Sequence, residues 1–145
     1  MKDKLSVASG NALGSALCAM GTFDRVVCDH VRVQSVHAGR VDCLLTVTPD
    51  LCNAYGTLHG GAIATLVDHC GTLALMSLKP LSPGVSLDIS CQYLSAAKVG
   101  EHLLISSVAL KNGTTISLAD VTIRMASEDG SGKIVAVGKH TKFVK

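Results

Sequence analysis

A glycine-rich turn that leads into a long apolar segment is the part of this sequence best suited to chemistry. Residues 53–61 read Asn-Ala-Tyr-Gly-Thr-Leu-His-Gly-Gly, and residues 62–78 carry a single carboxylate, Asp68. If a helix begins near Gly60, its first backbone N–H groups have no partner within the helix. Those donors, at the positive end of the helix dipole, can hold a phosphate or polarise a carbonyl oxygen.

The separation of Gly60 from Asp68 limits how such a site can be built. At a rise of about 1.5 Å per residue, the two residues lie about 12 Å apart along one helix, too far for one carbonyl group to contact both. Two antiparallel helices related by a two-fold axis would place Asp68 of one chain beside Gly60 of the other. If both groups serve one reaction, we expect an obligate dimer with two shared sites.

Residues 59–78 have the periodicity of an amphipathic helix. The polar residues Thr65, Asp68, His69 and Thr72 fall together on one side. One interpretation is a core helix with a solvated polar stripe. A functional stripe is favoured, because the stripe is narrow and follows a Gly-Gly start. The opposite face is expected to be buried and consists of Ile63, Leu66, Val67, Cys70, Leu73, Ala74 and Ser77.

The remaining chain predicts mostly strands, with no linker, repeat or low-complexity segment. A helix is expected over about residues 6–21, and strands over 26–36, 40–48, 85–94, 101–111, 114–126 and 133–144. Turns are expected at Ala38-Gly39, at Asn112-Gly113 and over 129–132, so that the last three strands form an antiparallel meander. We therefore predict an α+β fold in which a curved antiparallel sheet of about five or six strands wraps one long central helix.

Length and composition fit one domain that buries surface against copies of itself. The 145 residues are 48% apolar and 17% charged, and the net charge of +2 is too small to imply nucleic acid as a partner. Residues 62–78 are at the short limit for a membrane span and hold Asp68 and His69 at their middle, so no span is expected. Residues 1–22 are expected to form an N-terminal helix or tail, with a weak organelle-targeting signal as the alternative, and residues 23–145 the main domain.

The six cysteines follow no metal or disulfide pattern. None forms a C-x-x-C pair and no spacing fits a zinc site, so no metal is expected. With no secretory signal visible, we expect free thiols in a reducing compartment. Cys70 is interpreted as a core residue rather than a nucleophile, since the neighbouring His69 would point about 100° away from it on a helix.

Further motifs complete the pattern that begins with residues 53–61 and Asp68. They are Pro-Gly-Val-Ser-x-Asp at 83–88, Tyr-x-Ser-x-Ala-Lys-x-Gly-Glu at 93–101 and Gly-x-His-Thr-Lys at 138–142. Together these residues resemble the hotdog-fold thioesterases of the phenylacetate type, and within them the thioesterase superfamily member 2 type. The resemblance covers about residues 23–143. It implies a hotdog fold and the hydrolysis of acyl-coenzyme A with medium- to long-chain fatty acyl groups, in the cytoplasm or the mitochondrion.

The resemblance also implies roles for single residues. Gly60, through its N–H, and Asn53 would hold and polarise the thioester carbonyl, with His59 beside them. Asp68 of the partner chain would activate the attacking water, and Ser86 would help to place it. No cofactor is implied beyond the coenzyme A of the substrate, and relatives assemble as homodimers that pair as dimers of dimers. Coenzyme A would be bound by Gly61, Asp88, Tyr93, Leu94, Ser95, Lys98, Lys111, Asn112, Gly113, Thr114, Thr115, Ile116 and His140.

Several alternatives stay open at this point. Asp68 could act as a general base or as a nucleophile. A hotdog protein that binds acyl-coenzyme A without turnover would have no need of this acid, and a dehydratase would want an acidic residue just before the helix, which is not found. Asn53 could only cap a turn, His59 only satisfy the helix start, and Ser86 be a plain strand residue. His69, where relatives have a neutral amide, is interpreted as a structural or interface residue.

Overall fold

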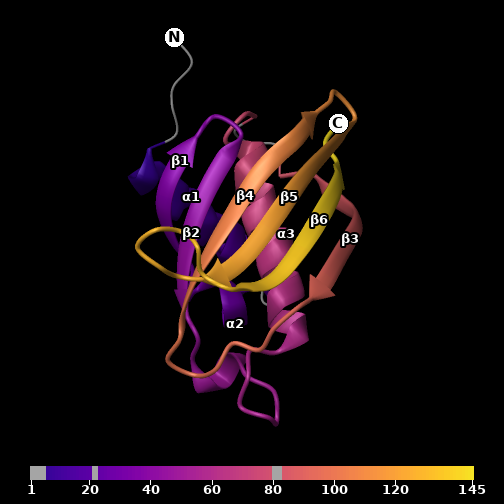
Figure 1. Ribbon diagram of the computed structural model, residues 1–145. Helices are drawn as coiled ribbons and strands as arrows, with labels where there is room; N and C mark the ends of the chain where they lie inside the picture. The colour runs from indigo at the N-terminus through magenta and orange to yellow at the C-terminus, as the bar shows by residue number, and fades with distance from the viewer. Residues whose placement is uncertain (1–5, 21–22, 80–82) are drawn as a thin grey trace.

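One long helix lies against the concave face of a six-stranded antiparallel sheet (Figure 1). The computed structural model of the chain describes residues 6–20, 23–79 and 83–145. The sheet order is β1-β2-β4-β5-β6-β3. The predicted α+β fold, with a curved sheet around one long helix, is confirmed. The elements are α1 (Val7–Met20), α2 (Arg25–Cys28), β1 (Arg32–His37), β2 (Arg40–Thr46), the 3-10 helix η1 (Pro49–Leu51), α3 (Gly60–Met76), β3 (Val85–Tyr93), β4 (His102–Asn112), β5 (Ile116–Met125) and β6 (Ile134–Phe143).

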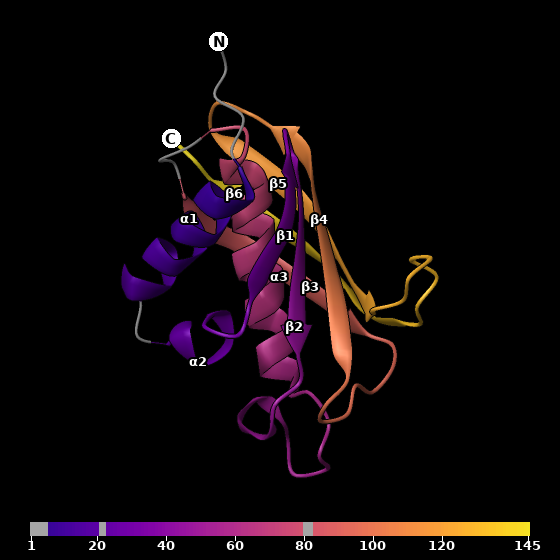
Figure 2. The same cartoon turned by 90° about the vertical axis from the view of Figure 1, so that its left-hand side faces the viewer.

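The two N-terminal helices cover the side of α3 that faces away from the sheet (Figure 2). α1 packs against β1 and α3, and α2 packs against α3 and η1. Thr65, His69 and Thr72 are buried, so that Asp68 alone of the predicted polar stripe stays partly open. The interpretation of this stripe as solvated is therefore wrong, because other elements of the same chain cover most of it.

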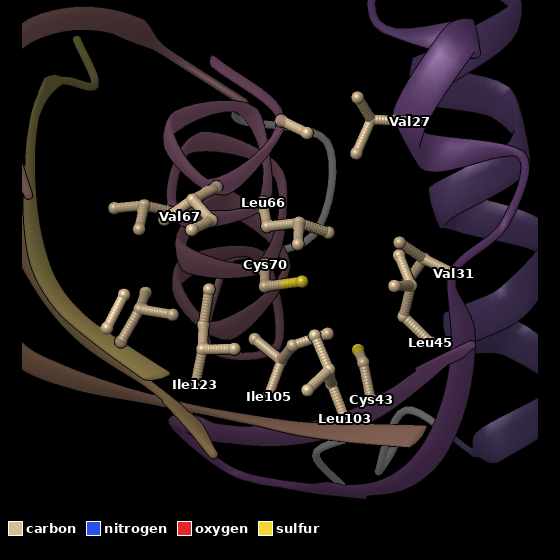
Figure 3. Packing of buried hydrophobic residues seen from close by; sticks show 14 of the residues in the cluster. Val27, Val31, Cys43, Leu45, Leu66, Val67, Cys70, Leu103, Ile105 and Ile123 are labelled. Atoms are coloured by element: carbon tan, nitrogen blue, oxygen red, sulfur yellow. The ribbon is translucent and has the colours of Figure 1, made fainter. Parts of the chain in front are cut away.

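The core fills the space between α3 and the sheet (Figure 3). Alternate residues of the central strands point inward, as Cys43 and Leu45 of β2 and Leu103 and Ile105 of β4 do. The predicted buried face of α3 is confirmed except at Ser77, which is half-buried. This packing fixes the rotation of α3 and hence the side on which Asp68 lies. The buried residues of that face are Ile63, Leu66, Val67, Cys70, Leu73 and Ala74.

The segment predicted as one strand over 26–36 is instead divided between a helix and a strand. α2 occupies its first part and β1 its last part. The carbonyl oxygen of Asp24 accepts hydrogen bonds from the N–H groups of Val27 and Cys28, and both of these side chains are buried. Burial of one helical turn thus outweighs the strand preference of its valines.

The other predicted elements lie within two residues of their observed bounds, and the last three strands form the predicted meander. Residues 113–115 connect β4 to β5, so this loop is one residue longer than the two-residue turn predicted from Asn112-Gly113. A register shift between Ala109 and Lys111 accompanies the longer loop.

In the described parts of the chain, no helix has both the length and the apolar character that crossing a membrane requires.

Two glycines let α3 approach β6 closely. A Cβ atom on Gly138 would lie 2.7 Å from Cγ2 of Val67 and 2.8 Å from the carbonyl oxygen of Ser90. On the helix side, a Cβ atom on Gly71 would lie 3.2 Å from Cβ of His140. Helix and strand therefore rest against each other at a separation that depends on the missing side chains.

The Gly138→Ala substitution should destabilise the fold. The added methyl group must displace α3 or β3, and overpacking of this kind costs about 1–3 kcal/mol. We expect a lower midpoint of urea unfolding at an unchanged m-value. Gly14→Ala in α1 is the matched control, because its added Cβ would meet side-chain atoms only at 3.4 Å or beyond. Equal midpoints for the two variants would contradict the close packing of α3 on β6.

Candidate active site

Asp68 faces a pocket between the middle of α3 and the ends of β3 and β6. The pocket has a volume of about 320 Å³. Ser86 lies near the start of β3, Lys142 near the end of β6, and Thr65 and Thr72 about one turn before and after Asp68. The fold thus gathers residues that are far apart in the sequence around one carboxylate. The rest of the lining consists of Asp24, His69, Pro83, Gly84 and Val85.

The two oxygens of the Asp68 carboxylate have different surroundings. Oδ1 lies 3.5 Å from Nε2 of His140, 3.5 Å from the hydroxyl of Thr72 and 4.0 Å from Nζ of Lys142. Among the described residues, Oδ2 has no hydrogen-bond or ion-pair partner, and 38% of the side chain is exposed. Oδ1 is therefore turned towards the protein, and Oδ2 is available to a molecule in the pocket.

His140 lies completely buried beneath Asp68 and Ser86. Its Nδ1 is 3.2 Å from the carbonyl oxygen of Asp68, and its Nε2 is 2.8 Å from the Ser86 hydroxyl. A carbonyl oxygen only accepts hydrogen bonds, so Nδ1 carries the proton. Burial, and next the charge of Lys142, lower the pKa of His140 to about 4, so the ring is neutral near pH 7. Nε2 therefore accepts the hydroxyl hydrogen of Ser86, whose lone pairs remain free.

The first turn of α3 leaves the backbone N–H of Gly60 open. His59 is the N-cap residue, and its Nδ1 accepts a hydrogen bond of 2.8 Å from the N–H of Gly61. In the part of the chain that the structure describes, the N–H of Gly60 has no hydrogen-bond partner. The hydroxyl of Tyr93 donates to the carbonyl oxygen of Gly60 at 3.3 Å, and its ring packs over this residue. The open N–H of Gly60 can therefore donate to an anionic or carbonyl oxygen.

Asn53 closes the loop before α3 on itself. Its Oδ1 accepts hydrogen bonds from the N–H groups of Tyr55 and Thr57, at 2.9 Å and 3.3 Å. Its Nδ2 donates to the hydroxyl of Thr57 at 3.0 Å. The turn-capping interpretation therefore describes the amide in this structure. The second hydrogen of Nδ2 is still available to a ligand, because an amide nitrogen carries two donors.

The structure brings some predicted site residues together and keeps others apart. Ser86 and His140 surround Asp68 in the middle of α3, whereas Gly60 lies about 12 Å away along the same helix. Asp88 is exposed on β3, next to a register shift in its pairing with β6. In this chain His140 contacts the predicted catalytic residues and has no exposed surface for coenzyme A. The start of α3, away from Asp68, holds the other predicted site residues next to Gly60, which are His59, Gly61 and Asn53.

The other residues predicted to bind coenzyme A lie at opposite ends of one protomer. Residues 93–98 lie by the start of α3, where Tyr93 contacts the first helical turn. Residues 111–116 lie by its other end, where Lys79 donates to the carbonyl oxygen of Gly113 at 2.6 Å. The 17 residues of α3 separate these ends by about 25 Å. One protomer therefore presents two distant surfaces, one of them with Lys98 and the other with Lys111.

Sequence reasoning placed Thr72 on the polar side of the helix and Lys142 at the end of the 138–142 motif, but it gave neither residue a role at the site. The ammonium group of Lys142 donates to the hydroxyl of Thr72 at 2.7 Å, and both side chains are buried. The scattered lysines of this sequence suggest a solvated surface. The period of two along β6 could have identified the exception, because His140 and Lys142 face the same side of the strand.

Within the described ranges, no three His, Cys, Asp or Glu side chains form a group that could hold a metal ion.

Known proteins share both the sequence and the fold of this chain. The family model of the thioesterase superfamily matches residues 55–141. Human acyl-coenzyme A thioesterase 13 is 39% identical over 129 residues, which are 89% of either chain. The crystal structure of zebrafish thioesterase superfamily member 2 is 38% identical, with a TM-score of 0.87 over 97% of this chain and 99% of that one. A hypothetical thioesterase protein from Streptococcus pneumoniae, solved with coenzyme A, is 29% identical, with a TM-score of 0.76 over 88% and 96%.

The pKa of His140 predicts how the stability of the fold changes with pH. The pKa is about 4 in the folded protein and about 6.5 in an unfolded chain, so between these values the unfolded chain binds more protons. The free energy of unfolding should therefore fall as the pH is lowered from 6.5 to 4. His140 contributes up to about 1.4 kcal/mol per pH unit to this slope. His69, whose pKa is also lowered by burial, acts in the same direction.

Urea unfolding of the wild type and of His140→Asn at several pH values between 4.5 and 7 tests this expectation. The variant should lose less stability than the wild type as the pH falls, whatever its stability at pH 7. Parallel pH profiles for the two proteins would show that the ring is not held neutral by the fold.

Proposed function

The chain belongs to the thioesterase superfamily, and on that premise we propose that it hydrolyses acyl-coenzyme A to a free acid and coenzyme A at a site shared by two copies. The observation that carries the proposal is the arrangement at Asp68. One carboxylate oxygen is open to the pocket, next to a Ser86 hydroxyl whose hydrogen is held by His140. Such a pair of acceptors can orient a water molecule for attack on a thioester.

Asp68 is proposed to act as a general base. A water molecule in the pocket would donate one hydrogen to Oδ2 of Asp68 and the other to the oxygen of Ser86, which leaves a lone pair of the water free. As the water oxygen bonds to the thioester carbon, its proton passes to Oδ2 and the negative charge moves to the carbonyl oxygen. The C=O bond then re-forms as the C–S bond breaks, and the proton on Oδ2 passes to the leaving sulfur, so that coenzyme A is released as its thiol. Direct attack by Oδ2 to form an anhydride is the second possibility for this residue.

The Gly60 N–H of a second copy is proposed to hold the thioester carbonyl oxygen. This donor is open, but it lies about 12 Å from Asp68 of the same chain. A preorganised donor aimed at the developing oxyanion contributes about 10²- to 10³-fold to the rate. The second amide hydrogen of Asn53, and His59 beside it, would support the same oxygen from the loop.

An exposed sheet edge supports a homodimer that would join these groups. At the β1 edge, Asn11 of α1 hydrogen-bonds the backbone N–H and carbonyl of Val33. At the other edge, β3 exposes 69% of Val85, 57% of Leu87 and 37% of Ile89. An open apolar edge strand is a template for pairing with another chain. Two β3 strands paired about a two-fold axis would continue the sheet and bring the two α3 helices side by side in opposite directions.

Coenzyme A is proposed to lie across more than one copy, because the residues expected to bind it lie at opposite ends of one protomer. Lys98 at one end and Lys111 at the other are exposed cations suited to phosphate groups. Two dimers would have to pair to bring such surfaces together, as a dimer of dimers. Medium- to long-chain fatty acyl groups, in the cytoplasm or the mitochondrion, are the proposed substrates, and no metal or further cofactor is part of the proposal.

The second candidate function is acyl-coenzyme A binding without turnover. It would leave the open carboxylate oxygen and the oriented Ser86 hydroxyl without a purpose. Incubation of the protein with saturated acyl-coenzyme A thioesters of graded chain length, in the presence of a thiol reagent, separates the two functions. Release of thiol that is proportional to enzyme supports hydrolysis, and no release at any chain length favours the binding protein.

The Asp68→Asn variant should lose at least about 100-fold in kcat, because the amide cannot accept the proton of the water. The side chain keeps its size, but the buried ammonium group of Lys142 loses the charge of Asp68, so the unfolding temperature should fall, and kcat is measured at a temperature at which the variant is folded. Asp120→Asn is the matched control, because Asp120 is an exposed carboxylate paired with Lys139 at 2.7 Å, away from the pocket. Thiol release by Asp68→Asn at the wild-type rate would remove this residue from the mechanism.

Co-expression of two inactive variants should restore activity if the site is shared. Gly60→Pro deletes the open N–H, and proline is well suited to the first helical position. His59 before it has φ −65° and ψ 137°, which a residue before proline readily adopts. In a mixed dimer of Gly60→Pro with Asp68→Asn, one of the two shared sites has both wild-type groups.

Random assortment should give about a quarter of the wild-type rate per protomer, because half of the dimers are mixed and each has one intact site. Each variant expressed alone is the control and should be nearly inactive. If the two groups acted within one chain, every site of the mixture would be defective. Activity no higher than that of the separate variants, in dimers shown by mass spectrometry to be mixed, would therefore exclude the shared site.

A further inference from the structure

A buried lysine lies on the inner side of Asp68. Lys142 projects from β6 towards α3 and is 5% exposed. Lysine is almost never buried to this extent unless it is paired, because its ammonium group loses its hydration. The ammonium group donates to the hydroxyl of Thr72 at 2.7 Å and lies 4.0 Å from Oδ1 of Asp68. The wall of the active-site pocket therefore holds a cation as well as an anion.

Thr72 fixes the position of this cation. Its hydroxyl lies 2.8 Å from the carbonyl oxygen of Asp68, to which it donates its single hydrogen. The hydroxyl oxygen can then accept from the ammonium group of Lys142. Lys142 is thus tied to the same turn of α3 that carries Asp68, on the side of Oδ1.

The neighbourhood of Oδ1 makes the cation important for the carboxylate. Nε2 of neutral His140 lies 3.5 Å from Oδ1 and already accepts the Ser86 hydrogen, so it has no hydrogen to donate to Oδ1, and the two electron-rich atoms repel each other. The charge of Lys142 offsets that repulsion. Without it, the remaining polar neighbours of Oδ1 in the described part of the chain would be the ring of His140 and the hydroxyl of Thr72, which already donates elsewhere.

We propose that Lys142 is a positioning residue for the hydrolysis, whose ammonium group holds Oδ1 of Asp68 against the wall so that Oδ2 faces the water. The inference rests on the proposed function, since it concerns the orientation of the proposed general base. Lys142 does not replace Asp68 as the base and gives no proton to the substrate. Its removal should therefore lower kcat much more than it changes KM.

The charged and titratable groups around Lys142 set the pH range in which it acts. Asp68 and His69 of α3, His140 of β6 and Asp24 before α2 face it or lie nearby. Burial lowers the pKa of Lys142, and the charges of Asp68 and Asp24 oppose this effect in part. The ammonium group therefore loses its proton at a lower pH than that of a surface lysine. As the pH rises through this value, the rate should fall.

Substitutions of Lys142 test the proposal by kcat, KM and the pH–rate profile. Lys142→Met, which keeps the length of the side chain without the charge, should lower kcat at least 10-fold with KM changed less than threefold. Lys142→Arg should recover most of this loss. Its rate should also persist to higher pH than that of the wild type, because a guanidinium group stays protonated. Lys139→Met on the same strand is the control, since Lys139 is exposed and pairs with Asp120.

Thr72→Val gives a second test that leaves the charge of the pocket unchanged. It removes the anchor of the ammonium group and should also lower kcat more than KM. This variant decides the outcome if Lys142→Met does not fold, as judged by its unfolding temperature. A wild-type kcat in folded Lys142→Met would overturn the inference. If that variant does not fold, a wild-type kcat in folded Thr72→Val would overturn it instead. Either result would leave the proposed function intact. Absence of thiol release by the wild type itself would overturn both.

Discussion

The structure of the site depends on the hydrogen bond between the ring of His140 and the backbone carbonyl of Asp68. This bond joins β6 to the middle of α3, and it forms because Gly71 and Gly138 let the helix approach the strand closely. It also fixes which ring nitrogen carries the proton. The direction of the Ser86 hydroxyl follows from that choice, so a packing contact in the core determines how a polar group is presented to the pocket.

Burial gives the groups around Asp68 different electrostatic roles. It lowers the pKa of His140 to about 4, so the ring is neutral near pH 7. It also lowers the pKa of Lys142, but this ammonium group is not an unpaired buried ion, because the charges of Asp68 and Asp24 lie close to it. Within the described residues, the polar contacts of the carboxylate all fall on Oδ1. An aspartate held by one oxygen keeps the other free, and a free carboxylate oxygen beside a hydroxyl with unused lone pairs is suited to orienting water.

The sequence predicts the fold well because its local signals agree with the tertiary packing. The periodicity of α3 and the turn signals around β4, β5 and β6 each report a face or a boundary that the fold uses. α2 was missed because valines at 26 and 27 favour a strand locally, whereas burial of Val27 and Cys28 against the core selects a helical turn. That preference depends on elements distant in the sequence, which single-residue propensity does not include.

The candidate site was predictable to the extent that its residues lie in recognisable motifs. Asp68 and Ser86 do, and the structure places both at one pocket. Lys142 ends the motif at 138–142, but no role was predicted for it, because a lysine in a strand usually faces solvent and this one lies on the inward side of β6.

The same geometry explains why one chain is not enough for the proposed reaction. α3 presents its open N–H at one end and its carboxylate two turns further on, and no bending of a packed helix brings them together. The surface at the β4–β5 loop, which carries Lys111, lies at the C-terminal end of α3. Pairing at the exposed edge of β3 would resolve the first separation, and the pairing of two such dimers would resolve the second. Pairing of two β3 strands would reverse the direction of the second α3, and a helix start would then lie opposite each carboxylate.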